Sequence, residues 1–141
     1  MSFKYLEHTA DVMFCAKEKT IKSLFTTAAN ACFDVMADPK TVQDKVTRTV
    51  AVKATDVKDL MFNFLQEIIF YKDADGLVFC KIEDVQVQIK KSNMALKATL
   101  HGDTISPKGQ VLRNDIKAVT LHQFKVEQRN NEWYMQVILD I

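Results

Sequence analysis

Apolar residues recur three and four positions apart in two stretches of the chain, residues 20–36 and 57–69. This spacing places them on one face of an amphipathic helix. Thr55 or Asp56 precedes the second stretch and can cap the free N–H groups at its start. Gly76 follows it, where a helix commonly ends in a left-handed residue. The pattern therefore predicts two helices.

The remaining apolar segments are short, and several alternate with polar residues. Alternation of this kind is typical of a strand with one buried face. Ser92-Asn93 and 129–131 are the expected hairpin turns. We expect strands at 3–7, 12–16, 45–54, 77–82, 85–89, 94–100, 116–127 and 133–141.

Two helices among six or so strands, most of them joined by hairpins, predict an α+β fold. We expect two helices packed on a largely antiparallel sheet of about six strands. The 141 residues fit one domain, 1–141. A polar segment at 102–114 is long enough to be a functional loop.

Composition narrows the function classes. Apolar residues make up 48% and charged residues 26%, which excludes disordered and collagen-like chains. The formal net charge is +1, which argues against a dedicated duplex-binding module and leaves contact with RNA through a partner. The chain shows no signal-peptide pattern and no apolar run as long as the ~18 residues of a membrane span. The three cysteines form no CxxC pair, so we interpret them as small buried side chains in a cytoplasmic protein.

Standard catalytic motifs are missing from the sequence. It contains no GxxxxGK[ST], GxGxxG, HExxH or GxSxG. Three polar clusters remain as candidates for chemistry, at residues 8–11, 117–122 and 139–141.

The cluster at 139–141 holds two anions side by side. Alternation puts Asp140 on the other face of the last strand from Leu139 and Ile141. Because this strand is apolar almost to its final residue, we expect an ordered chain end that holds the Asp140 carboxylate beside the α-carboxylate of Ile141, and two anions repel unless a cation compensates. With Asp11 there would be three hard oxygen ligands, which suit Mg²⁺, Mn²⁺ or Ca²⁺. Sequence spacing does not show that they meet. The alternatives are a solvated Asp140 and a turn residue at Asp11.

The other polar residues have simpler interpretations. His8 and His122 are expected to be hydrogen-bonded structural histidines, because no nucleophile accompanies them. Lys117 is expected to be solvated or at a sheet edge. Lys117, Thr120 and His122 together would suit a phosphate, although in an ideal strand Lys117 points away from the other two.

At these clusters the sequence resembles the archease family. The segments FKYLEHTADVMF, DLMFNFLQEIIFYKDADGLVF, KAVTLHQFKV and the terminal VILDI are similar to the signatures of that family, in the same order. Met13 stands where glycine is frequent in the family, and the loop at 102–114 lacks a basic-His element often found there.

The resemblance implies an accessory protein, not an enzyme, with no catalytic residues of its own. Its expected partner is the GTP-dependent tRNA-splicing ligase, whose active-site histidine it would help to guanylylate and to which it would give multiple turnover. The family's divalent-metal site carries over to Asp11, Asp140 and the terminal carboxylate of Ile141, here called the acidic tip. The remaining candidate contacts with ligase or nucleotide are His8, Lys117, Thr120 and His122.

Further expectations are RNA contact only through the ligase, no membrane contact, a monomer and a cytoplasmic location. Two alternatives stay open. One is a chaperone-like module that binds RNA or protein without metal chemistry. The other is a metal-dependent hydrolase, which lacks a recognisable base or nucleophile.

Overall fold

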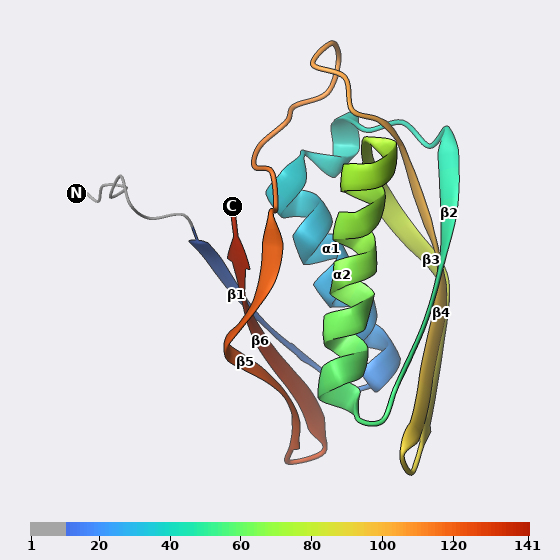
Figure 1. Cartoon of the computed structure of the whole chain (residues 1–141), viewed down its shortest axis with the longest axis vertical. Coiled ribbons are helices and arrows are strands. Elements are labelled where there is room, and N and C mark those ends of the chain that lie inside the picture. Colours follow the sequence, from blue (N-terminus) through green and yellow to red (C-terminus); the bar gives the residue numbers. More distant parts are fainter. Residues whose placement is uncertain (1–10) are drawn as a thin grey trace, which may run out of the picture.

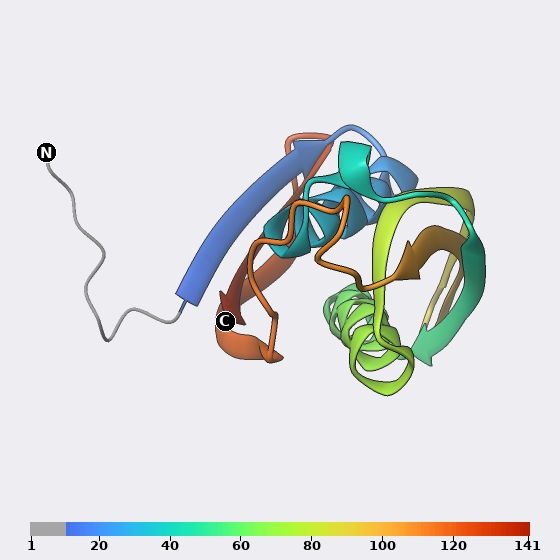
Figure 2. The ribbon, with the colours of Figure 1, turned by 90° about the horizontal axis from the view of Figure 1, so that it is seen from above.

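The computed structural model describes residues 11–141, which form six strands and two α-helices in three layers (Figure 1). Each outer layer is a three-stranded antiparallel sheet, with strand orders β1-β6-β5 and β2-β4-β3. The two helices lie between the sheets (Figure 2). The elements are β1 (Asp11–Glu18), α1 (Ile21–Met36), the 3₁₀ turn η1 (Pro39–Thr41), β2 (Val46–Ala54), α2 (Val57–Asp75), β3 (Leu77–Lys90), β4 (Asn93–Thr104), β5 (Ala118–Arg129) and β6 (Glu132–Asp140).

The predicted α+β class is confirmed, with two helices and antiparallel strands. The strands divide between two sheets, whereas the sequence pattern suggested one. Alternation shows which face of a strand is buried, but it does not show which strands pair. The strand expected at 3–7 lies outside the described residues.

Both helices begin and end where local chemistry directs. The side chain of Thr20 accepts from the N–H of Ser23 at 3.0 Å at the start of α1. Asp56 does the same for Asp59 at 2.8 Å, so Asp56 and not Thr55 caps α2. Gly76 ends α2 with φ of 64°, as expected for a left-handed cap.

The helices bury more than one stripe because a sheet lies on either side. On α1, Ala29 and Phe33 are buried in addition to the predicted face. The Phe33 ring lies 5.6 Å from that of Phe79 on β3, and Phe25 lies edge-on to Phe64 of α2 at 5.5 Å. One hydrophobic core thus joins both sheets to the helices.

The cysteines do not all share one environment. Cys32 is fully buried, and burial raises the pKa of its thiol to about 12. Cys80 is partly buried, and burial is the main cause of its raised pKa. The expectation of burial is wrong for Cys15, which is exposed because it alternates outward on β1, opposite Gln136.

Within the described range, neither α1 nor α2 combines the length and the apolar character that crossing a lipid bilayer requires.

Gly102 on the central strand β4 lies against the backbone of β3. A Cβ at this position would be 2.0 Å from the carbonyl oxygen of Val78 and 2.7 Å from the Cα of Phe79. We expect Gly102→Ala to lower the free energy of unfolding by about 3 kcal/mol, because backbone atoms have to move. Urea denaturation followed by circular dichroism measures this. Gly76→Ala is the control, with free space but a positive φ, and should cost only about 1 kcal/mol. Equal losses would contradict the steric argument.

Candidate functional site

The structure places Asp11 and Asp140 directly opposite each other. They are partners at one end of the antiparallel β1-β6 pair, and Ala118 of β5 is the partner of Asp140 on its other side. Side chains of directly opposed residues project from the same face, with Cβ atoms about 4.5–5.5 Å apart. Residues 129 positions apart therefore form a carboxylate pair, which spacing alone did not show.

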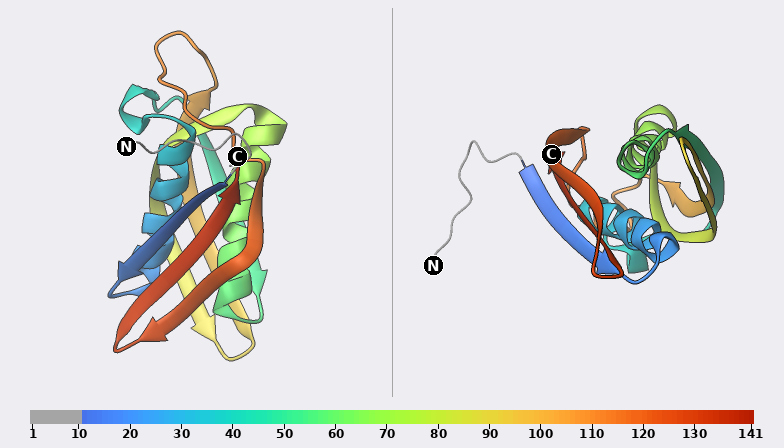
Figure 3. Two further views of the ribbon diagram at one scale, coloured as in Figure 1. Left: turned by 90° about the vertical axis from the view of Figure 1, so that its left-hand side faces the viewer. Right: turned by 90° about the horizontal axis from the view of Figure 1, so that it is seen from below.

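Burial of the neighbouring row turns the two carboxylates outward. Val12, Leu139 and Val119 are partners across the three strands, and Leu139 and Val119 belong to the core. Successive side chains of a strand point to opposite faces, so Asp11 and Asp140 face away from the helices. Asp11 is exposed and Asp140 is half-buried. Figure 3 shows this sheet face-on, with the C-terminus at its upper end.

Contacts with the segment before β5 hold the end of β6. The N–H of Lys117 donates to the carbonyl oxygen of Asp140 at 2.7 Å. Ile116 is fully buried, and Nζ of the buried Lys72 donates to Asp115 Oδ1 at 2.5 Å. Burial alone would lower the pKa of Lys72. The hydrogen bonds to Asp115 and Asp73 outweigh this effect, so the net shift of the pKa is upward. Ile141 is half-buried against the core. The chain end is therefore ordered.

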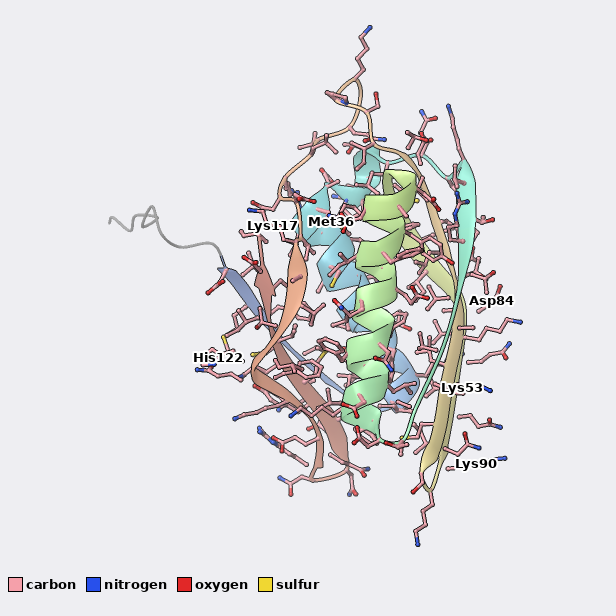
Figure 4. All side chains as sticks on the ribbon, in the orientation of Figure 1. Met36, Lys53, Asp84, Lys90, Lys117 and His122 are labelled. Carbon is pink, nitrogen blue, oxygen red and sulfur yellow. The ribbon has the colours of Figure 1, made fainter. Side chains whose placement is uncertain are left out.

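The three residues weighed for phosphate binding do not lie on one regular strand. Lys117 precedes β5, and the hydroxyl of Thr120 donates to the carbonyl oxygen of Ile138 at 2.9 Å. Thr120 pairs with Ile138 and Lys125 with Gln136, so residues 121–124 form a bulge opposite Val137. Figure 4 shows His122 and Lys117 well apart along this side of the molecule. The alternation that was used to orient them does not extend through the bulge.

Residues 11–141 contain no cluster of three or more His, Cys, Asp or Glu side chains suited to a metal ion. The pair Asp11 and Asp140 supplies two carboxylates. A third ligand would be the carboxylate of Ile141 or a group outside the described residues. His8 lies outside them, so the structure does not place it.

A hydrogen-bond network that the sequence pattern did not reveal lies on the same outer face as the pair, four residues farther along β1 and β6. The hydroxyl of Tyr134 donates to Gln136 Oε1 at 2.9 Å, and Gln136 Nε2 donates to the carbonyl oxygen of Gln123 in the bulge at 2.9 Å. The hydrogen bond with Cys15, followed by burial, raises the pKa of Tyr134. Alternation along β6 could have identified Tyr134 and Gln136 as outward-facing residues on the same side as Asp140. The bulge at 121–124 has no signal in the sequence.

A second charged cluster, centred on His101, lies on the other sheet. Its ring nitrogens are 3.0 Å from Asp44 Oδ1 and 2.8 Å from Glu83 Oε1. Lys81 Nζ lies 3.3 Å from Asp44 and 3.2 Å from Glu83. Desolvation raises the pKa of Asp44, but hydrogen bonds from Lys81 and His101 outweigh it and the net shift is downward. The cluster ties the segment before β2 to β3 and β4.

The opposed carboxylates should repel when no cation is bound. We expect Asp11→Asn to raise the free energy of unfolding by about 0.5 kcal/mol at neutral pH and low salt, in the presence of chelator. Urea denaturation measures the change, and added salt should reduce it. Glu132→Gln is the matched control and should give no gain, because Glu132 lies 3.9 Å from Lys17 Nζ. A neutral or destabilising Asp11→Asn would show that the pair does not repel.

Comparison with known proteins agrees with the resemblance seen in the sequence. A profile of the Archease protein family (MTH1598/TM1083) matches residues 3–141. The chain is 32% identical over 139 residues to protein archease of Methanosarcina acetivorans, covering 99% of this chain and 95% of that protein. Protein archease of Thermococcus kodakarensis is 33% identical over 142 residues, covering 99% and 98%.

Solved structures show the same fold. The solution structure of Methanobacterium thermoautotrophicum protein 1598 superposes with a TM-score of 0.78 at 28% identity, covering 96% of each chain. The crystal structure of an archease, possible chaperone, from Thermotoga maritima gives a TM-score of 0.62 at 15% identity, covering 100% of this chain and 98% of that one. With relatives above 30% identity and a family profile that match nearly its full length, this chain belongs to the archease family.

Proposed function

We propose that this protein is an accessory factor of a GTP-dependent tRNA-splicing ligase. It would promote guanylylation of the ligase's active-site histidine and allow multiple turnover. The observation that carries the proposal is the opposed pair of Asp11 and Asp140 at an exposed sheet end, in a chain that belongs to the archease family.

The pair fits a divalent cation. Two carboxylates on directly opposed residues offer hard oxygen ligands at short range, and a cation would offset their repulsion. Oxygen ligands favour Ca²⁺, Mg²⁺ or Mn²⁺ over softer metals. The carboxylate of Ile141 would be the third ligand of the acidic tip. When bound, such an ion supplies positive charge that stabilises phosphate oxygens.

The placement of the pair suits insertion into a partner. Asp11 is exposed and Asp140 half-buried, so the carboxylates project from a rigid sheet end. A projecting site is complementary to a concave one, as expected of an active-site cleft in another protein. Lys117, Thr120 and His122 would make further contacts with the ligase or nucleotide, as would His8.

Metal binding is testable on the isolated protein. After removal of metal by chelation, we expect Ca²⁺ or Mn²⁺ to raise the melting temperature, since a ligand at about 100 times its Kd stabilises by ~2.7 kcal/mol. Asp11→Asn and Asp140→Asn should lose this shift, and Glu132→Gln should retain it. Calorimetric titration provides the second readout. An equal shift in all four proteins would exclude the acidic tip as the metal site.

The accessory role is testable by multiple-turnover RNA ligation with the organism's own ligase and GTP. We expect stimulation by the wild-type protein and its loss in Asp11→Ala, whose melting temperature should change little. Residues added after Ile141 should also abolish stimulation, because they remove the adjacent carboxylate.

The outcomes of the ligation assay separate the alternatives. Full stimulation by all three proteins would keep the accessory role and reject the acidic tip. Absence of stimulation by the wild type would contradict the proposal and favour a chaperone-like module. Phosphatase or nuclease activity that Asp140→Ala abolishes would favour a metal-dependent hydrolase.

A further inference from the structure

The outer face of the β2-β4-β3 sheet carries a hollow of about 540 Å³. Two rows of cross-strand partners line it. Lys97 of β4 lies between Ala51 and Gln86, and in the next row Ala95 lies between Lys53 and Gln88. The two alanines leave space at the centre, and lysine and glutamine side chains surround it.

The hollow is separate from the core and from the acidic tip. Strand alternation directs Leu96 to the helices, where it is buried, and directs its neighbours Ala95 and Lys97 to solvent. Figures 1 and 4 show this sheet on the opposite side of the helices from β1, β5 and β6, with Lys53 and Lys90 on that side.

Positive charge on this face is not neutralised within the described residues. No carboxylate of residues 11–141 lies within 4.0 Å of the Nζ of Lys53, Lys90, Lys91 or Lys97. Lys90 and Lys91 extend the charge toward the β3-β4 turn. The exposed Asp84 lies in the bulge beside the upper row. We call the surface formed by Lys53, Lys90, Lys91, Lys97, Gln86 and Gln88 the lysine face.

At the other end of the same sheet, charged side chains are close to groups of opposite charge. There Lys81 lies beside Glu83 and Asp44, and His101 lies between those two carboxylates. Lys81 is therefore paired with carboxylates, whereas the lysines of the lysine face remain available to a ligand.

The chemistry of the lysine face restricts its ligand. The backbone of β4 is already paired on both sides, so it cannot accept an added peptide strand. No aromatic side chain lines the hollow, so bases cannot stack there. Val52, Val87 and Leu96 also line it, but their side chains pack toward the core, so the two alanine methyl groups are left to meet an apolar side chain. Charge and amide groups are what the surface presents. These suit a polymer of regularly repeated anions.

We propose that the lysine face binds the phosphate backbone of single-stranded nucleic acid. Residues two apart on a strand are about 6.6 Å apart and neighbouring strands about 4.8 Å, so the ammonium groups can reach successive phosphates. Binding through phosphates carries no base information, so RNA and DNA should bind similarly. This inference is independent of the proposed function, because it concerns the other sheet.

Fluorescence anisotropy tests this with labelled oligouridylate and oligodeoxythymidylate of about 20 nucleotides, longer than the ~4–16 nucleotides of a typical single-strand site. Chelator is present, and sodium chloride is varied. We expect binding that weakens with salt, with a log–log slope of about −2 to −3 for three or four phosphate contacts. Lys53→Gln/Lys97→Gln should weaken binding about tenfold and reduce the slope by about 1.4.

Matched controls separate this face from general charge. Lys17→Gln/Lys125→Gln removes the same charge from exposed positions on the other sheet and should leave binding within about twofold of wild type. Ala95→Glu should abolish binding, because it places an anion in the hollow. Melting temperatures confirm that each variant is folded. Asp11→Asn should bind normally, so failure here is distinguishable from failure of the acidic tip.

Three results would overturn the inference. They are no binding at low salt, equal weakening in both double variants, and binding of polyglutamate as tight as that of RNA with the same dependence on Lys53 and Lys97. The last would identify an acidic protein segment as the occupant.

Discussion

The register between β1 and β6 is the constraint on which the candidate site depends. In the observed register, Val12 faces Leu139 inside the molecule and Asp11 faces Asp140 outside. A slip of one residue would turn the buried row to solvent and carry Asp140 toward the core. The hydrophobic core therefore determines where the carboxylates meet. Burial of the apolar row stabilises this register although the two carboxylates repel each other. Residues farther along β6 also fix the register with β1, because Met135 and Val137 are fully buried.

Because the helices lie between the two sheets, the outer face of each sheet does not pack against the core. The outward side chains include Asp11 and Asp140 at one end of the β1-β6-β5 sheet, and Lys53 and Lys97 in two outward rows of the β2-β4-β3 sheet. Side chains on these faces contribute little to burial, so their chemistry can differ without changing the core. The same architecture explains how one small domain can present an anionic site and a cationic surface on opposite sides.

Local features were predictable from the sequence, whereas features that depend on distant partners were not. Helix periodicity and the capping chemistry of Asp56 and Gly76 act within a few residues, and both agree with the structure. The division into two sheets, the bulge at 121–124 and the exposure of Cys15 depend on which strand lies alongside. For the site, alternation in β6 predicted that Asp140 faces away from the core. The resemblance to the archease family, not spacing, brought Asp11 to it.

Charge gives the clearest case of information that a sequence total cannot hold. A formal net charge of +1 argued against direct contact with nucleic acid, yet it is a sum over surfaces that point in different directions. Electrostatic attraction between a protein and a polymer acts over about 8–10 Å at moderate salt, a distance shorter than the width of a domain. A nucleic-acid strand bound at the lysine face is therefore affected mainly by the charges of Lys53, Lys90 and Lys97. The charges of Asp11 and Asp140 lie beyond the helices, and salt screens their repulsion of the nucleic acid. Local charge on each face, and not the total, is the quantity that decides what this molecule binds.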